Sequence, residues 1–403
     1  MRGAAEIAEL VGRGELDPVE VVEEALERIA GARDLNAIMV TDGARALERA
    51  RAGVTGRLAG VPLLVKDLID VAGLRIAYGS KLYADRVAET TAVSVRALEA
   101  EGAIVVATTG CDEFAWGVSG QNAHWGDTGN PHRPGRITGG SSSGNASALA
   151  VGMGALALGT DTGGSVRVPA AACGVVGLKT PIGAISTEGV FPLVPALDTV
   201  GPMARTVEDC ALAWSILSGE PVPEPSLEGK RLGKLTRLPS LGEPEPAGGR
   251  GRDPRSDALP GEPVQLPVPE HDVWPVFYAG AAESHRGLFP EREADYGPAI
   301  RAKLSQAIRT TPEAARSGHE AMAAWQRAAA QDPPVDVIVS PVLGLPELPA
   351  IETPEEEFRI AFSSYARPFN FLGWPAIAIG ETQLAARDMR TLLETALAWR
   401  SVR

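Results

Sequence analysis

The chain has 403 residues, a length that allows one large α/β domain or two smaller domains. Hydrophobic residues make up 44% and charged residues 22%, a globular composition that excludes a collagen, a coiled coil and a wholly disordered chain. Asp and Glu number 51 against 38 Lys and Arg, which gives a formal net charge of −13. We expect no nucleic-acid ligand, because such a surface repels phosphate.

Patterns typical of membrane, secretory and metal-binding proteins are missing from the sequence. No run of about 18 apolar residues is found, and residues 1–3 lead directly into an amphipathic pattern. We therefore expect a cytoplasmic protein with no membrane partner. The histidines form no ligand cluster and the cysteines have no CxxC spacing, so neither a metal nor a disulfide is expected; the cysteines are Cys111, Cys173 and Cys210.

The first half of the chain predicts alternating helices and strands. Apolar residues recur at helical spacing over 4–11 and 19–29, and Asp17-Pro18 supplies a cap before the second helix. Short apolar runs predict strands at 61–65 and 103–107, with a helix at 91–100 between them. Strand, helix and strand in this order predict an α/β fold with a parallel or mixed sheet.

The second half begins with a segment that is rich in Gly, Ser and Ala. Residues 137–186 carry few charges, which are Asp161, Arg167 and Lys179. Residues 219–270 are rich in Pro, Gly and charge and predict a flexible surface excursion within a single domain of residues 1–403, with one short strand at 231–237. We predict further helices at 299–309 and 312–330, and strands at 335–340 and 376–380.

Two Ser-Gly turns flank one predicted helix-strand unit and suggest a catalytic site. They are GGSSSGN (139–145) and GTDTGGS (159–165). The second lets successive backbone N–H groups converge into a nest for an oxyanion, which makes Ser165 a candidate nucleophile. No histidine stands in a triad pattern, so Lys66 at the end of a predicted strand is the candidate base. That role requires its pKa to fall by roughly 3 units, which burial can supply.

At this point the chain resembles the amidase signature family of serine hydrolases. The resemblance covers about 58–209 and rests on GVPLLVKD (60–67), DEFAWG (112–117), the two Ser-Gly turns, CGVVGLKTP (173–181) and LDTVGPMARTVED (197–209). It implies an α/β/α fold, a mixed central sheet with helices on both faces. It also implies a Ser-cisSer-Lys triad: Lys66 is the base, Ser141 the bridging serine after a cis peptide bond, and Ser165 the acylated nucleophile.

The resemblance also suggests the surroundings of the triad. The N–H groups of Thr162, Gly163, Gly164 and Ser165 would hold the oxyanion. Backbone groups of Ala115 and Gly117 would line the acyl side, and Asp161 and Arg167 would pair beside the nucleophile. Ser142 would be a structural neighbour. The alternative that Ser142 is the nucleophile of a GxSxG elbow is disfavoured, because residues 130–140 predict a loop and not a strand.

The predicted function is therefore hydrolysis of a small-molecule carboxamide to a carboxylate and ammonia, without a cofactor; a homodimer is left open. Two alternatives remain: a glutaminase A subunit of a tRNA-dependent amidotransferase, and a non-catalytic binding protein of the same fold. Ser363 occupies the position at which that glutaminase family has a glutamine-binding acid. Nearby aromatic residues predict a preference for apolar or aromatic amides; they are Phe362, Phe369, Phe371 and Trp374.

Overall fold

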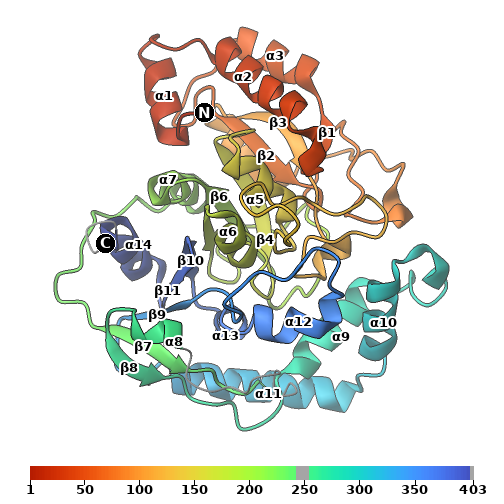
Figure 1. The fold of residues 1–403 in the computed structure, drawn as a ribbon, viewed down its shortest axis with the longest axis vertical. Coiled ribbons are helices and arrows are strands. Elements are labelled where there is room, and N and C mark those ends of the chain that lie inside the picture. Colours follow the sequence, from red (N-terminus) through yellow and green to blue (C-terminus); the bar gives the residue numbers. More distant parts are fainter. Residues whose placement is uncertain (242–253, 400–403) are drawn as a thin grey trace.

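Eleven strands form one mixed sheet in the computed structural model, which describes residues 1–241 and 254–399. The strand order is β1-β3-β2-β4-β6-β5-β10-β11-β9-β7-β8 (Figure 1). The bounds are β1 Ile38–Thr41, β2 Pro62–Lys66, β3 Ile104–Thr109, β4 Leu156–Asp161, β5 Val176–Lys179, β6 Thr199–Ala204, β7 Leu232–Arg237, β8 Glu262–Gln265, β9 Val337–Pro341, β10 Ala376–Ile379 and β11 Thr382–Ala386.

The three strands β3, β2 and β4 are parallel and form the part of the sheet that carries the site. Each is buried along its whole length, which explains their continuous apolar sequences. Helix α4 (Val93–Ala100) connects β2 with β3, and α5 (Ser143–Ala150) connects β3 with β4. Because parallel strands end at the same edge, Lys66 at the end of β2 and Asp161 at the end of β4 lie at one edge of the sheet.

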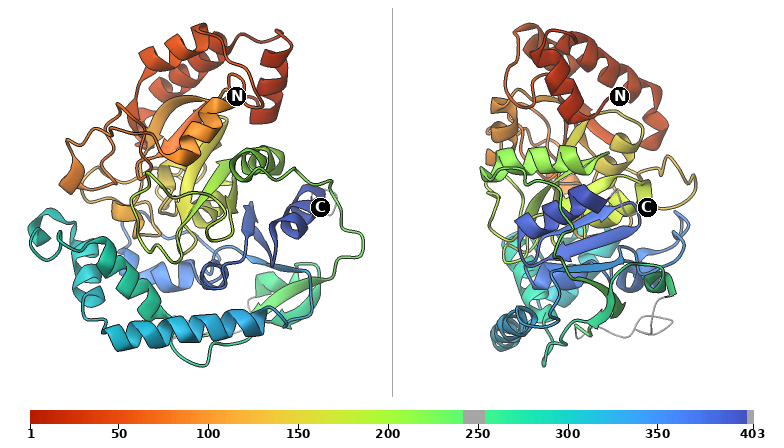
Figure 2. Two further views of the ribbon diagram at one scale, coloured as in Figure 1. Left: turned by 180° about the vertical axis from the view of Figure 1, so that it is seen from behind. Right: turned by 90° about the vertical axis from the view of Figure 1, so that its left-hand side faces the viewer.

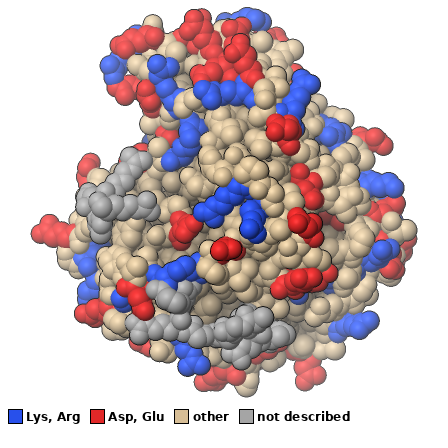
Figure 3. All heavy atoms as spheres, viewed as in Figure 1, with Lys and Arg blue, Asp and Glu red and all other residues tan. Residues whose placement is uncertain are grey.

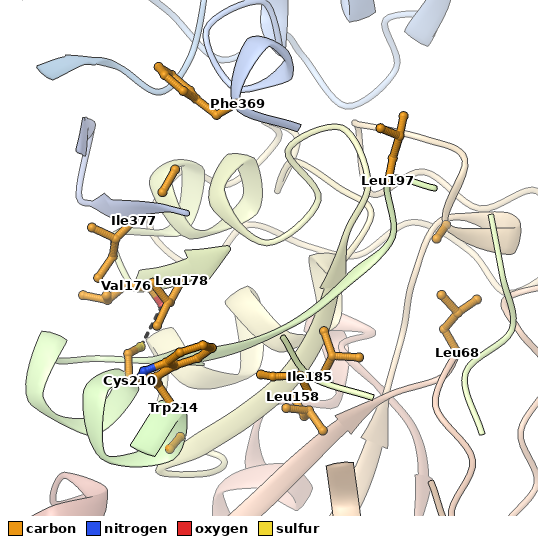
Figure 4. Packing of buried hydrophobic residues seen from close by; sticks show 14 of the residues in the cluster. Leu68, Leu158, Val176, Leu178, Ile185, Leu197, Cys210, Trp214, Phe369 and Ile377 are labelled. Carbon is orange, nitrogen blue, oxygen red and sulfur yellow. Dashed lines mark hydrogen bonds between the residues drawn. The ribbon is translucent and has the colours of Figure 1, made fainter. Parts of the chain in front are cut away.

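Helices cover both faces of the sheet. Leu63 and Val65 belong to one buried apolar cluster and Leu64 to another, as the two-residue period of a strand requires. Figure 4 shows part of the first cluster, where Trp214 packs near β5. The remaining helices are α1 Ala4–Gly12, α2 Pro18–Gly31, α3 Gly43–Arg51, α6 Arg167–Cys173, α7 Val207–Ser218, α8 Pro254–Asp257, α9 Trp274–Ser284, α10 Pro298–Ala307, α11 Pro312–Ala329, α12 Glu355–Phe362, α13 Arg367–Phe371 and α14 Met389–Ala398.

The outermost helices lie at two opposite ends of the molecule. Helices α1 to α3 gather at one end, and α9, α10 and the long α11 lie at the other (Figures 1 and 2). Acidic and basic side chains are interspersed on the face seen in Figure 3. Among the described residues, no helix is both long and apolar enough to cross a membrane.

Most predicted elements are confirmed to within a few residues, including both N-terminal helices and the predicted strands. The Asp17 side chain caps α2 by accepting a hydrogen bond from the Val19 N–H at 2.8 Å. The prediction for 219–270 is wrong in part: besides β7, it contains α8 and the edge strand β8, which pairs with β7. Residues 242–253 of that segment lie outside the described part of the chain. The assignment of residues 1–403 to one domain stays a prediction.

Candidate active site

Lys66 ends β2 with its ammonium group inside the protein. The side chain is fully buried, and Nζ donates hydrogen bonds to Ser141 Oγ at 2.7 Å and to Thr160 Oγ1 at 2.8 Å. Burial lowers the pKa of Lys66 to about 8, although nearby acidic groups, including Asp112, oppose that shift. This value lies in the range that a lysine base requires.

The serine turn before α5 lies against the second turn. The peptide bond between Gly140 and Ser141 is cis, as the resemblance implies. The Ser142 N–H donates to the Ser165 carbonyl at 3.1 Å, and Ser142 Oγ reaches the Thr160 carbonyl at 3.4 Å. These contacts bring both serine turns and Lys66 together. They also give Ser142 a structural role, because its hydroxyl faces the backbone of β4.

A buried ion pair organises the turn of Ser165. Arg167 donates from Nε to Asp161 Oδ2 and from Nη2 to Asp161 Oδ1, both at 3.0 Å, and both side chains are fully buried. Burial alone would raise the pKa of Asp161, but the charge of Arg167 holds it well below its usual range. The predicted ion pair is therefore confirmed.

One part of the predicted oxyanion nest needs correction. The Gly164 N–H donates to Asp161 Oδ1 at 2.8 Å, so it is already engaged and does not point to a substrate. Gly164 has φ +115°, and a Cβ there would come within 2.8 Å of the Ala366 Cβ, so the position requires glycine for the turn itself. Thr162, Gly163 and Ser165 remain the candidate donors. Thr162 is fixed by its hydroxyl, which donates to Asp198 Oδ1 at 2.6 Å.

Asp112 fixes the loop that carries Ala115 and Gly117. Its carboxylate accepts the N–H groups of Ser119 and Gly120, each at 3.1 Å. A Cβ on Gly117 would come within 2.1 Å of this carboxylate. Burial raises the pKa of Asp112 to about 7, and the negative charge of Glu355 adds to this shift. Sequence reasoning used Asp112 only as part of a motif, because its partners are backbone groups that no side-chain pattern reveals.

Residues from the distant C-terminal half complete the ion pair. Arg167 Nη1 donates to Gln383 Oε1 at 2.6 Å, and Nη2 donates to Asn370 Oδ1 at 2.7 Å. Asn370 Nδ2 donates in turn to Asp161 Oδ1 at 2.8 Å. These positioning residues were missed, because no local pattern reveals a partner some 200 residues away. Thr160 was missed as well, since its hydroxyl meets Lys66 only in the folded sheet.

A pocket of about 520 Å³ joins the predicted residues at the surface of the site. Ser165, Gly163, Ala115 and Gly117 all line it. Its other walls are largely aromatic or charged, and include Trp116, Trp274, Phe277, Tyr278, Lys303, Glu355, Arg359 and Arg367.

The aromatic residues predicted for the pocket do not line it. Phe362 and Phe369 are fully buried, and Phe371 and Trp374 are 2% and 6% exposed. The prediction was wrong because α12 and α13 turn these rings towards the core, whereas α9 supplies most rings of the pocket.

The cysteines and potential metal ligands offer no competing chemistry in the described part of the chain. Cys111, Cys173 and Cys210 are free and buried, and burial raises the pKa of Cys173 to about 12. Within residues 1–241 and 254–399, no group of three or more His, Cys, Asp or Glu side chains could hold a metal ion.

Comparison with known proteins identifies the family. The model of the Amidase family matches residues 20–228, which is more than half of the chain. The chain belongs to the amidase family. A solved amidase structure has 30% identity and a TM-score of 0.85, with all of both chains covered. The peptide amidase from Stenotrophomonas maltophilia has 27% identity and a TM-score of 0.80, with 99% of this chain and 96% of that chain covered.

Curated relatives resemble the chain over about half of its length. The glutaminase-type A subunit of the glutamyl-tRNA(Gln) amidotransferase of Akkermansia muciniphila is 45% identical over 208 residues, which are 51% of this chain and 44% of the relative. The AtzE subunit of the 1-carboxybiuret hydrolase of Pseudomonas sp. (strain ADP) is 42% identical over 238 residues, 56% of this chain and 52% of the relative. The chain spans about half the length of the curated relatives it matches.

Proposed function

We propose that the chain is a serine amidase that hydrolyses a small carboxamide to a carboxylate and ammonia. The observation that carries this proposal is the buried contact between Lys66 and Ser141 beside the turn of Ser165. A lysine with a pKa of about 8 is neutral in a useful fraction of molecules near neutral pH. Ser165 opens onto the pocket, where a carbonyl carbon can reach it.

In the proposed reaction, Ser165 Oγ attacks the amide carbon while its proton passes to Ser141, whose own proton passes to neutral Lys66. The N–H groups of Thr162, Gly163 and Ser165 stabilise the oxyanion. Lys66 then returns the proton through Ser141 to the nitrogen, the C–N bond breaks, and ammonia leaves. Water hydrolyses the acyl-enzyme by the same proton path and regenerates Ser165. This chemistry uses no cofactor.

The surrounding contacts support this assignment of roles. Thr160 accepts a hydrogen bond from Lys66 and thereby aims Nζ at Ser141. The Asp161 carboxylate, paired with Arg167, holds the N–H groups of Gly164 and Val166, so the turn of Ser165 is fixed on both sides. A preorganised turn of this kind lowers the cost of reorganisation during the reaction.

Release of ammonia from a panel of amides tests the proposal. Benzamides, short aliphatic amides and glutamine are each incubated with the wild type, with Ser165→Ala and with Ser317→Ala, whose serine is exposed on α11. We expect turnover in the wild type and Ser317→Ala, and a loss of several orders of magnitude in Ser165→Ala. Absence of turnover on every amide would favour the non-catalytic binding protein.

A glutaminase component of an amidotransferase is the second candidate function, favoured by the relatives of that name. Against it, Ser363 is buried and its hydroxyl donates to the Arg359 carbonyl at 3.0 Å, so this residue offers no acid to the ammonium of glutamine. Copurification with two partner proteins, and glutamine hydrolysis that occurs only in their presence, would support this candidate.

A further inference from the structure

Four charged side chains line the pocket of Ser165, and they do not balance. Lys303, Arg359 and Arg367 are basic, and Glu355 is the acidic member of the pocket lining. Charged groups that close a largely apolar pocket are costly to desolvate unless something neutralises them. The partners of each charge therefore indicate what the pocket receives.

Lys303 and Glu355 neutralise each other. Lys303 Nζ lies 2.6 Å from Glu355 Oε1 and also donates to the Trp116 carbonyl at 2.6 Å. Glu355 Oε2 accepts the Val118 N–H at 2.8 Å and the Ser119 hydroxyl at 3.0 Å. Although burial would raise the pKa of Glu355, the charge of Lys303 lowers it, so this carboxylate stays ionised. The pair ties down the loop and adds no net charge.

Arg367 lies close to the nest. Ala366, the residue before it, accepts a hydrogen bond from Arg167 Nη1 at 2.9 Å and packs against Gly164. Arg367 Nη2 donates to the Arg359 carbonyl at 2.6 Å, and its guanidinium lies 5.3 Å from the centroid of the Trp274 ring. These contacts hold α12 and α13 together on the pocket side of the nest.

Arg359 differs from the other three charged residues. It is half-buried on α12 and lines the pocket, yet its guanidinium makes no hydrogen bond or ion pair with any residue that the structure describes. Its charge is thus available within the pocket that contains the candidate nucleophile. A planar guanidinium is well suited to bind a carboxylate through two parallel hydrogen bonds.

We infer that Arg359 is a specificity residue that binds a carboxylate of the substrate, so the preferred substrates are amides that also carry an acid group. This inference rests on the proposed function. The body between the two groups is apolar or aromatic, because Trp116, Trp274, Phe277 and Tyr278 line the same pocket. The substrate class is therefore the monoamides of apolar dicarboxylic acids.

The same wall discriminates against free amino acids such as glutamine. An ammonium group near the carboxylate needs an acidic partner, and both Glu355 oxygens are engaged by Lys303, Val118 and Ser119. Arg359 and Lys303 would repel that ammonium. An amide acid that lacks the amino group satisfies Arg359 without this repulsion.

Binding to the Ser165→Ala variant tests the inference without turnover. 4-Carbamoylbenzoate is titrated into Ser165→Ala alone and combined with Arg359→Gln, Arg359→Lys or Arg316→Gln; Arg316 is exposed on α11 and serves as the matched control. The neutral probe is 4-methylbenzamide. We expect Arg359→Gln to weaken binding of 4-carbamoylbenzoate about tenfold or more, with partial recovery in Arg359→Lys and no change in Arg316→Gln. Binding of 4-methylbenzamide is expected to change far less.

Equal affinity for 4-carbamoylbenzoate with and without Arg359→Gln would overturn the inference, as would equal binding of the two probes. Thermal melting of each variant checks the fold, which we expect to be retained because only the Arg359 carbonyl contacts Arg367 and Ser363. Arg359-dependent binding without ammonia release by the wild type would contradict the proposed amidase activity and leave the binding site supported. The two failures are therefore distinguishable.

Discussion

Lys66 Nζ lies 2.7 Å from Ser141 Oγ, although 75 residues separate the two in the chain. The contact forms because β2 ends at the same edge of the sheet as the turn that precedes α5. Both side chains are fully buried, so Lys66 loses the hydration that normally stabilises its charged form. The contact thus links a lowered pKa to a hydroxyl that can carry a proton.

The first prediction concerns the pH dependence of activity. Protonated Lys66 cannot accept the proton of Ser141, so kcat/KM should rise with pH and level off above an apparent pKa of about 8. Initial rates of ammonia release, measured from about two pH units below this pKa to two above it, give this curve. In Lys66→Ala most of the activity should be lost and the remainder should lack this rise. An unchanged rise in Lys66→Ala would assign the base to another residue.

The second prediction concerns stability. In the unfolded chain Lys66 has its ordinary pKa of 10.5, against about 8 in the folded state, so between these values the unfolded chain binds more protons. Its burial costs about 3 kcal/mol below the folded-state pKa, and the cost disappears as the pH rises to the unfolded-state value. The gain in unfolding free energy of Lys66→Met over wild type should shrink by about that amount across this window. Urea unfolding measures it, and a constant difference would contradict a buried, lowered pKa.

The third prediction separates the two neighbouring serines. Ser141→Ala removes the hydroxyl that carries the proton and should lower kcat by roughly 10²- to 10⁴-fold with little change in KM. Ser142→Ala removes only a 3.4 Å contact to the Thr160 carbonyl, so its loss of kcat should be much smaller. Steady-state kinetics compare them. An equal or larger loss in Ser142→Ala would favour the GxSxG alternative.

The fourth prediction concerns the buried pair of Asp161 and Arg167. Asp161→Asn leaves the buried charge of Arg167 unpaired and should lower the unfolding free energy by roughly 3 to 5 kcal/mol. The pKa of Asp161 is lowered in the folded state, so its contribution is present above its ordinary pKa of 3.8 and is lost as the pH falls further.

Urea unfolding of Asp161→Asn at neutral pH measures this loss. The matched control is Glu283→Gln, which breaks an exposed pair with Arg286 and should change stability by less than about 1 kcal/mol. Similar losses in the two variants would show that the buried pair has no special weight.

The sequence alone predicted the parts of the site that depend on local pattern. Lys66 ends a continuous apolar strand, and Ser141 and Ser165 lie in glycine-rich turns that few other functions require. Asn370 and Gln383 could not be predicted, because their partner Arg167 lies about 200 residues away. Gly164 was misassigned as an oxyanion donor because a motif does not show which way an N–H points.

The pocket was predicted least well. Aromatic residues near 370 were correctly recognised as part of the C-terminal region of the fold, but they point into the core. Most rings of the pocket come from α9, and its charges from α10, α12 and α13. Which face of a short helix meets a pocket depends on packing between distant segments, and α13 has only 5 residues from which to read a period.

Peptide mapping of the chain after reaction with a fluorophosphonate tests the central claim most directly. An activated serine nucleophile forms a stable phosphonyl ester, which mass spectrometry assigns to one residue. We expect a single adduct on Ser165 in the wild type, no adduct in Ser165→Ala, and much slower labelling in Lys66→Ala. An adduct on Ser142 or on another residue, or an unlabelled wild type, would contradict the assignment of Ser165 as the nucleophile.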